Sequence, residues 1–332
     1  MLRAVETSGV GVLTLVEREL PPVTGSEVRL EVIYCGVCGS DLQMSNDPTY
    51  PQGRVLGHEF TGVVSEVGPN VSKWSLGDRV AVLPNISCGG ECFHCQEGNE
   101  NFCTEGGHLG WVAGVQGQGG LADSVVVPET CLFRVPDGVS DKGAAITEPT
   151  AVALHAVKRV ISEVNEPIVV FGAGPVGLLA ASILRHRGFT DISVIETNPA
   201  RRAVAEKIGF TTTANEVAPE NRPPTVIDAT GAAAAIEAAI QIIRNRGNLI
   251  LVGLPNNKVE IDLSYAILHG IDFLAAAGYT RQDFSDALAI LDAGAIPVDD
   301  IVTDVVKLDS AQSTFQQLLS AETNQIKVLL EP

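Results

Sequence analysis

Four cysteines lie close together in the first third of the chain, and their spacing indicates metal chemistry. Gaps of three, two and seven residues separate Cys88, Cys92, Cys95 and Cys103, in a stretch rich in glycine and polar residues. Thiolates at this spacing can reach one Zn²⁺ from different directions and form a closed tetrahedral structural site. The alternatives are disulfide-linked loops and an iron–sulfur cluster, but the spacing fits neither common ferredoxin pattern. A structural zinc lobe is therefore the preferred interpretation.

A second set of possible metal ligands is scattered along the sequence. Cys38 lies in Cys-Gly-Ser-Asp, His58 and Glu59 are adjacent, and Glu148 precedes a proline. A catalytic zinc takes about three protein ligands and keeps one position open, where it lowers the pKa of a bound hydroxyl. Each residue alone could be structural: a buried thiol, a loop histidine or a carboxylate at a helix start. Together, Cys38, His58 and one carboxylate predict a catalytic zinc site.

A glycine-rich motif marks a candidate dinucleotide site. Gly-Ala-Gly-Pro-Val-Gly follows a predicted strand and opens a predicted helix, where glycines admit a tight turn and a pyrophosphate at the helix N-terminus. An acidic residue ends the next predicted strand, where it can accept hydrogen bonds from the adenosine ribose and repel a 2′-phosphate. NAD is thus favoured over NADP, although a nearby arginine could meet such a phosphate. The predicted cofactor-binding residues are Gly172, Gly174, Pro175, Val176, Gly177, Glu196 and Arg201.

Composition limits the classes of partner. The 332 residues predict two domains, and the formal net charge of −18 would repel nucleic acid and anionic membrane surfaces. No apolar run is long enough to cross a bilayer, and the N-terminal charges do not fit a signal peptide. We therefore expect a cytoplasmic protein with neither nucleic-acid nor membrane partners. In that reducing location, the seven cysteines are better interpreted as ligands or buried thiols than as disulfides.

The remaining pattern predicts the elements that position these residues. Residues 1–149 are β-rich, because turn-forming clusters separate short strands at 28–32, 62–67, 79–83 and 124–127. In residues 150–291, strands at 168–171, 192–195, 226–227 and 249–252 alternate with helices at 175–187, 199–208 and 232–243. That alternation predicts an α/β fold with a doubly wound parallel sheet. Residues 292–332 are too few to bury a core alone, so we expect their two strands and helix to return to the first domain.

The sequence resembles the zinc-dependent medium-chain alcohol dehydrogenase/reductase family nearly from end to end. The resemblance rests on the ordered motifs Gly36-Val-Cys-Gly-Ser-Asp41, Gly57-His-Glu-Phe60, Gly77-Asp-Arg-Val80, the cysteine lobe, Glu148-Pro149 and Gly172–Gly177. The stretches that begin at Glu148 and Gly278 are similar to polyol (sorbitol) and 2,3-butanediol dehydrogenases, in which a glutamate replaces a cysteine ligand. The resemblance implies an N-terminal GroES-like catalytic domain, rejoined by the C-terminal tail, and a Rossmann NAD-binding domain.

The resemblance also implies roles for individual residues. Cys38 and His58 would hold the catalytic zinc, with Glu59 and Glu148 as alternatives for the remaining place. Ser40 would take the proton of the substrate hydroxyl as the hydride passes to NAD, and Asp41 would fix the ring of His58. The implied substrate is a secondary alcohol, namely a diol or small polyol such as 2,3-butanediol or sorbitol. Alternatives are a cyclic alcohol or aminocyclitol of a biosynthetic pathway and a non-catalytic NAD-binding protein. A homodimer or homotetramer is also implied.

Three positions depart from the family pattern. Gln43 replaces a histidine that passes the proton to solvent in many members, so water or the ribose must complete the relay. Gly278 replaces an arginine that grips long sugar alcohols, which favours shorter diols or cyclic alcohols. The lobe has three residues, not two, between its first two cysteines. The candidates for contact with substrate are Tyr50, His108, Trp111 and Tyr279.

Overall fold

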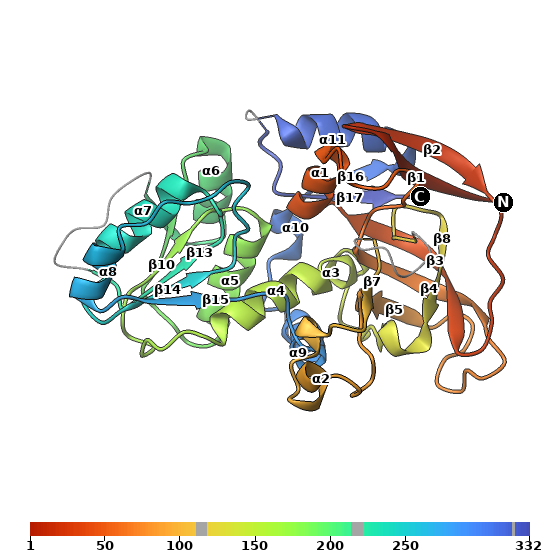
Figure 1. The fold of residues 1–332 in the computed structure, drawn as a ribbon, viewed down its shortest axis with the longest axis horizontal. Coiled ribbons are helices and arrows are strands. Elements are labelled where there is room, and N and C mark those ends of the chain that lie inside the picture. Colours follow the sequence, from red (N-terminus) through yellow and green to blue (C-terminus); the bar gives the residue numbers. More distant parts are fainter. Residues whose placement is uncertain (111–117, 214–221, 321–322) are drawn as a thin grey trace. The chain divides into compact units, whose positions relative to one another are not determined.

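The computed structural model describes residues 1–110, 118–213, 222–320 and 323–332. Two compact units form within it, and each combines separate stretches of the chain (Figure 1). The second unit differs from the predicted second domain at its C-terminal side, because residues 280–292 belong to the first unit and residues 293–301 to the second. The first unit contains Met1–Glu148, Thr280–Asp292 and Val302–Pro332, and the second contains Pro149–Tyr279 and Ala293–Ile301.

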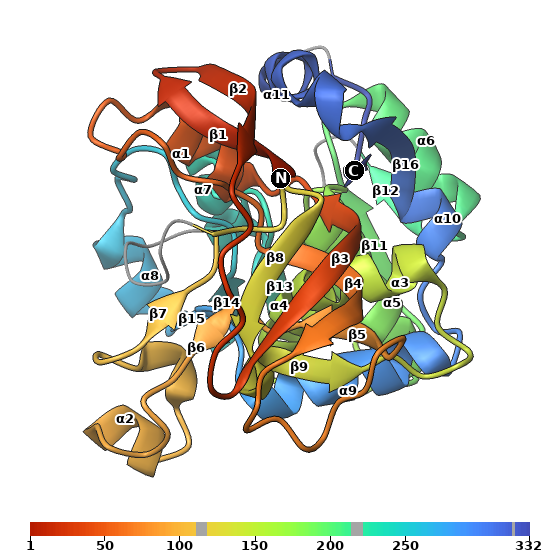
Figure 2. The same cartoon turned by 90° about the vertical axis from the view of Figure 1, so that its right-hand side faces the viewer.

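A mixed sheet forms the framework of the first unit. Its strands follow the order β16-β17-β3-β4-β5-β9, and β8 pairs with β3 outside this path (Figure 1 and Figure 2). The pairs are antiparallel except for β16 with β17, which is parallel. The C-terminal strands thus extend the sheet that the N-terminal residues begin. The bounds are β3 (Glu27–Gly36), β4 (Glu59–Val67), β5 (Arg79–Val82), β8 (Ser124–Pro128), β9 (Leu132–Arg134), β16 (Val302–Lys307) and β17 (Lys327–Glu331); β1 (Leu2–Gly9) and β2 (Val12–Arg18) form a separate hairpin.

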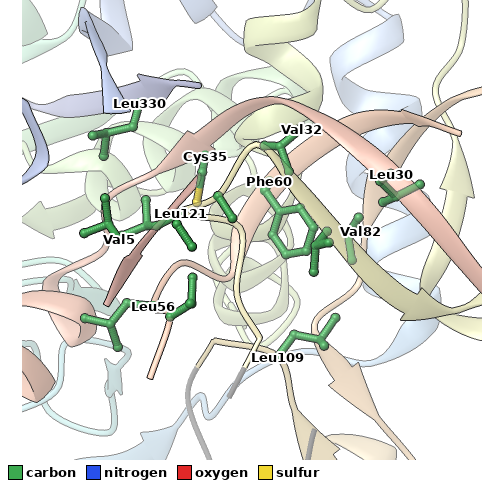
Figure 3. Close-up of a cluster of buried hydrophobic side chains, with 14 of the residues drawn as sticks. Val5, Leu30, Val32, Cys35, Leu56, Phe60, Val82, Leu109, Leu121 and Leu330 are labelled. Carbon is green, nitrogen blue, oxygen red and sulfur yellow. The ribbon is translucent and has the colours of Figure 1, made fainter. Parts of the chain in front are cut away.

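Alternating burial explains why these segments are strands. Leu30 and Val32 of β3 are buried, whereas Glu31 between them is exposed, which is the two-residue period of a pleated strand. In Figure 3, Phe60 of β4 lies beside Val82 of β5 in the same buried cluster. Because a slip of one residue would turn the apolar rows to solvent, their burial fixes the register of the sheet. The register in turn decides which residues meet where the strands begin and end.

Short helices and two small strands complete the first unit. The start of helix α3 is fixed by its own sequence, because the Ser140 hydroxyl accepts a hydrogen bond from the backbone N–H of Gly143 and caps the N-terminus of the helix. The helix α4 (Thr147–Val157) begins in the first unit and continues into the second. The other elements are α1 (Gly39–Asn46), β6 (Asn85–Ile86), α2 (Phe93–Gln96), β7 (Gly107–His108), α3 (Asp141–Ala145), α9 (Arg281–Asp292) and α11 (Ala311–Leu319).

The second unit contains a parallel sheet with the strand order β12-β11-β10-β13-β14-β15. The chain starts at β10 in the middle, builds outward to one edge, and then returns to build the other, which is the Rossmann order. The β10 segment Ile168–Phe171 is entirely buried, as expected for a central parallel strand. The other strands are β11 (Ile192–Ile195), β12 (Thr211–Thr213), β13 (Thr225–Asp228), β14 (Asn248–Leu251) and β15 (Asp272–Ala275).

The helices of the second unit follow its strands in alternation. Asn198 caps α6, because its side chain accepts hydrogen bonds from the backbone N–H groups of Ala200 and Arg201, and Pro199 occupies the first helical position. The α/β fold predicted from the sequence is therefore confirmed. No helix of the described residues is long and apolar enough to cross a bilayer. The helices are α5 (Pro175–His186), α6 (Pro199–Lys207), α7 (Ala233–Ile242), α8 (Leu263–His269) and α10 (Val298–Ile301).

Candidate functional site

Cys38, His58 and Glu59 come together at one end of the first sheet. Their sulfur, imidazole nitrogen and carboxylate oxygen all lie within 4.8 Å of one another. The pairing of β3 with β4 causes this convergence, since Gly36 at the end of β3 is opposite Glu59 at the start of β4. Donor atoms bound tetrahedrally to one zinc lie about 3–4 Å apart, and thiolate, imidazole and carboxylate are all zinc ligands. The donor set therefore fits one zinc ion.

The buried carboxylate of Asp41 organises these residues. It is fully buried, and its Oδ2 accepts a hydrogen bond of 2.9 Å from the backbone N–H of Cys38. Its Oδ1 accepts one of 3.2 Å from the backbone N–H of Gly57 and lies 3.4 Å from Nδ1 of His58. Burial lowers the pKa of His58, but the carboxylate of Asp41 and the sulfur of Cys38 outweigh it and hold this pKa well above its usual value. Because Nδ1 faces Asp41, Nε2 is the ring nitrogen left for a metal ion.

The other predicted carboxylate, Glu148, is not one of these three donors. It is buried in the first turn of α4. Its charge still contributes to the pKa of Lys327, which is lowered by burial and raised more strongly by Glu59, Cys38 and Glu148. Glu59 is thus the carboxylate that shares a donor cluster with Cys38 and His58.

The remaining candidates have different surroundings. Ser40 lies in the first turn of α1, half-buried and two residues after Cys38. The ring of His108 is 5.6 Å from that of His58, and its Nδ1 is 2.9 Å from the carbonyl oxygen of Leu109. Burial and the neighbouring His58 lower the pKa of His108 to about 3, so its ring is neutral. Tyr50 is half-buried in the first unit, Tyr279 is buried in the second, and Trp111 lies outside the described residues.

The cysteine lobe brings all four of its sulfur atoms within 4.8 Å of one another, including that of Cys88. The extra residue of the lobe is absorbed by Gly89 and Gly90, whose φ angles of +76° and +106° are accessible mainly to glycine. All seven cysteines lie in the described part of the chain, and each is a free thiol. The four sulfurs of the lobe fit a closed tetrahedral site.

Backbone N–H groups in the lobe point at cysteine sulfurs and favour their thiolate form. The backbone N–H of Cys92 lies 3.2 Å from the sulfur of Cys88, and that of Cys88 lies 3.3 Å from the sulfur of Cys103. Backbone N–H groups of Cys95 and Thr104 lower the pKa of Cys92 to about 6. Burial and the three neighbouring sulfurs raise the pKa of Cys95 to about 12, because several negative charges are unfavourable without a cation. The positive charge of a bound metal ion would offset this repulsion between thiolates.

The glycine motif forms the turn between β10 and α5. Gly172 has a φ of +97°, and a Cβ on Gly177 would overlap the carbonyl oxygen of Gly172. Both positions therefore need glycine, while Gly174 caps α5 with open space around its Cα. Pro175 and Val176 open the helix, whose N-terminus favours an anion such as pyrophosphate.

Glu196 is fixed at the end of β11 beside this turn. Its Oε2 accepts a hydrogen bond of 2.8 Å from the backbone N–H of Ala173, and its Oε1 accepts one of 2.7 Å from that of Asn198. Each carboxylate oxygen can accept a further hydrogen bond, so the group is pre-positioned for ribose hydroxyls. Arg201 lies in the first turn of the following helix, α6.

One functional candidate was not found from the sequence. Lys327 is buried in β17, and its ammonium contacts Glu59. A lysine in a short C-terminal strand has no motif around it, and 267 residues lie between the two partners. The one available signal is a charged residue at the start of an apolar strand, Lys-Val-Leu-Leu, which is also typical of an exposed strand end.

Comparison with known proteins places this geometry in a family. The model of the alcohol dehydrogenase GroES-like domain matches residues 24–137, and that of the zinc-binding dehydrogenases matches residues 175–293. D-arabitol-phosphate dehydrogenase of Enterococcus avium is 32% identical over 98% of this chain and 96% of its own length. The structure of 2R,3R-butanediol dehydrogenase from Bacillus subtilis is 28% identical, with a TM-score of 0.87 over 100% of both chains. A protein described as a zinc-binding dehydrogenase from Sinorhizobium meliloti 1021, bound to NADP, is 27% identical with a TM-score of 0.90 over 100% of this chain and 99% of its own.

The chain belongs to the zinc-dependent medium-chain alcohol dehydrogenase family. Within that family it lies in the polyol-type branch, which contains dehydrogenases of sugar alcohols and of butanediol. The protein is therefore an oxidoreductase that acts on alcohols, as predicted from the order of its motifs.

Loss of one lobe cysteine tests the proposed structural zinc. Cys92→Ser removes one of four thiolates from a closed site, so the zinc content should fall from about two to about one ion per chain. Cys131→Ser is the matched control, because Cys131 is a buried thiol outside both clusters and should leave the zinc content unchanged. Metal analysis after dialysis measures both variants. Two retained ions in Cys92→Ser would contradict the assignment of the lobe.

Proposed function

We propose that this protein catalyses the reversible NAD-dependent oxidation of a diol or small polyol at a zinc centre formed by Cys38, His58 and Glu59. The observation that carries this proposal is the convergence of three different donor atoms within 4.8 Å, two of them from residues that Asp41 contacts. A cluster of thiol, imidazole and carboxylate leaves a position open for substrate, unlike the closed lobe of four thiols. Glu148 supports this centre from outside the cluster, and the lobe holds the second, structural zinc through Cys88, Cys92, Cys95 and Cys103.

Each residue has a defined part in the reaction. When bound, zinc supplies a Lewis acid that lowers the pKa of the substrate hydroxyl. Ser40, two residues after Cys38, accepts the hydroxyl proton and passes it to water, since Gln43 cannot titrate. Asp41 keeps the ring of His58 in one orientation and one tautomer. NAD, which the glycine turn at Gly172–Gly177 and Glu196 would hold, would supply the hydride acceptor when bound.

The substrate class follows from the branch and from one departure. Two of the relatives compared above are named D-arabitol-phosphate dehydrogenase and 2R,3R-butanediol dehydrogenase. Gly278 offers no side chain to grip a long sugar alcohol, which supports a shorter diol or polyol. A cyclic alcohol or aminocyclitol is the alternative outcome of a substrate test.

A substrate panel tests this function. With NAD, the zinc-loaded protein should oxidise 2,3-butanediol or a small polyol faster than cyclitols, as followed by NADH absorbance. Ser40→Ala should lower kcat by about 10²–10⁴-fold, because a positioned proton acceptor contributes that much. Ser45→Ala in the same helix is the control, since its hydroxyl donates to the carbonyl oxygen of Leu42 and should leave kcat within about threefold. Activity confined to cyclic alcohols would replace the diol proposal by its alternative.

We also propose that NAD is preferred to NADP. The pre-positioned carboxylate of Glu196 supports NAD, because it pairs with ribose hydroxyls and repels a 2′-phosphate. Gly172, Gly174, Pro175, Val176 and Gly177 form the pyrophosphate turn. Arg201 is the residue available to a 2′-phosphate, and the similar protein from Sinorhizobium meliloti binds NADP.

Removal of the Glu196 carboxylate should change this preference. Glu196→Ser should raise KM for NAD by about tenfold or more, because hydrogen bonds to a charged group are lost. The ratio of kcat/KM with NAD to kcat/KM with NADP should therefore fall. Glu206→Ser is the control, since Glu206 on α6 accepts a hydrogen bond from Thr212 at an exposed position. Initial rates with both cofactors measure the ratio. An unchanged ratio in Glu196→Ser would refute the role.

We further propose a homodimer or homotetramer in which edges of the second-unit sheets pair. The strand β15 lies at one edge of that sheet, and edge strands have unpaired backbone groups that favour pairing with another chain. Nearby in sequence, α8 exposes large apolar side chains, with Leu263, Ile267 and Leu268 at 61%, 76% and 82% exposure. Exposed apolar residues in such a group favour a protein interface.

Charges on α8 should disrupt this association. The double variant Ile267→Glu/Leu268→Glu should be a monomer by light scattering, because burial of two unpaired carboxylates is unfavourable. Leu319→Glu on α11 is the control, since Leu319 is 49% exposed on the first unit and should leave the assembly intact. An unchanged mass of the double variant would exclude α8 from the interface. The cytoplasm remains the proposed location, and a reducing compartment suits the seven free thiols.

A further inference from the structure

A buried ammonium group shares the carboxylate of the catalytic cluster. Lys327 and Glu59 have side chains only 2% and 1% exposed. The Nζ of Lys327 donates to both oxygens of Glu59, at 2.8 Å to Oε1 and 2.5 Å to Oε2. It also donates at 2.9 Å to the carbonyl oxygen of Val37, the residue before Cys38. Lys327 therefore contacts one candidate ligand directly and the backbone next to another.

The order of three strands creates this arrangement. β17 pairs with β3, which in turn pairs with β4, so Lys327, Gly36 and Glu59 lie on consecutive strands. Gly36 leaves the space between them open, because a Cβ at this position would overlap Oε2 of Glu59. A further hydrogen bond of 3.0 Å, from the backbone N–H of Val37 to the carbonyl oxygen of Val328, fixes β17 against the segment that leads to Cys38.

The local charges explain why a cation is needed here. Cys38, Asp41, Glu59 and Glu148 supply acidic groups within one buried region, and Asp41 and Glu59 are almost completely buried. Buried carboxylates without a partner are strongly unfavourable. The Nζ of Lys327 donates to both oxygens of Glu59 and to the carbonyl oxygen of Val37, and all three partners suit an ammonium group. Lys327 thus supplies the positive charge that faces the acidic groups of the site.

We propose that Lys327 is a positioning residue that competes with the catalytic zinc for the Glu59 carboxylate and thereby weakens the hold of the site on the ion. The inference rests on the proposed function in one respect, namely that Glu59 is a ligand. A carboxylate oxygen can accept from Lys327 and still offer a lone pair to a metal ion. The ammonium and the metal ion, on the same carboxylate, repel each other. The hydrogen bonds from Lys327 hold the Glu59 carboxylate in one position. The ammonium also neutralises part of the negative charge that would otherwise attract the metal ion.

The direction in which metal affinity changes on loss of Lys327 distinguishes competition for Glu59 from a purely structural role. If Lys327 only supported the fold, its loss would disorder Glu59 and weaken metal binding. If it competes for Glu59, its loss removes a positive charge beside the ion and strengthens metal binding. Metal affinity, rather than activity, is therefore the decisive measurement.

The test compares four variants for binding of zinc to the catalytic site, with the lobe zinc retained. Lys327→Met and Lys327→Gln should each bind zinc at least about tenfold more tightly in competition with a chromophoric chelator, since a neighbouring cation is lost. Lys327→Arg keeps the charge and should stay within about threefold of the wild type. Lys307→Met is the matched control, because Lys307 on the adjacent strand β16 pairs with Glu331 at the exposed surface and should change nothing. Co²⁺ in the same site should show an altered visible spectrum in Lys327→Met and Lys327→Gln alone.

Two results would overturn the proposal: weaker binding in both neutral variants, or unchanged affinity with a wild-type Co²⁺ spectrum. Lys327→Gln retains a donor for Glu59, so it keeps the test decisive if Lys327→Met does not fold. In the Glu59→Gln background, the gain from Lys327→Gln should be smaller than in the wild type, because the shared carboxylate is gone and only the repulsion between the ammonium and the metal ion remains.

The outcomes also separate this inference from the proposed function. If the affinities follow the predicted order but the zinc-loaded wild type oxidises no alcohol with NAD, the inference stands and the proposed reaction fails. If alcohols are oxidised while the neutral variants bind zinc like the wild type, the reaction stands and the role of Lys327 fails.

Discussion

The catalytic region depends on one buried carboxylate, that of Asp41. It accepts hydrogen bonds from the backbone N–H groups of Cys38 and of Gly57, the residue before His58, and it faces the ring of His58. A carboxylate in such a place is unfavourable unless its hydrogen bonds are made, so the two loops must close around it. The hydrogen bonds that satisfy Asp41 therefore also bring together the ligand that follows β3 and those at the start of β4. When these loops close around Asp41 during folding, the site forms at the same time.

The two predicted metal centres differ in how much of their geometry is local. The lobe takes its four sulfurs from a short stretch, and backbone amides of that stretch point at them. The catalytic cluster takes its groups from the ends of separate strands, and a lysine from a third strand contacts one of them. A local site can be recognised by spacing alone, whereas a distributed site depends on the register of a whole sheet.

This difference also explains what could be predicted from the sequence. The alternating elements, the glycine turn, the cap at Asn198 and the lobe were all predictable, because each depends on neighbouring residues. Edge strands such as β12 (Thr211–Thr213) were missed, since three threonines have too short a pattern. The contact between Lys327 and Glu59 was missed for the opposite reason, because sheet order alone brings these residues together. The place of α9 in the first unit, rather than in the second domain, also follows from contacts distant in sequence, since Phe284 packs on Phe133 and the backbone N–H of Arg281 donates to Glu100.

The late position of β17 in the chain has a consequence for folding during synthesis. All strands of the second unit are made before residue 276, so its parallel sheet can form while the ribosome is still at work. In the first sheet, β4 and β8 pair with β3 early, but the end of β3 at Cys35 and Gly36 lacks its second neighbour over the synthesis of nearly 300 further residues, until β17 emerges. Until then, the acidic groups near Cys38 lack their lysine, and the nascent chain exposes an unpaired strand end. A chaperone that covers this edge would act on the first unit and not on the second.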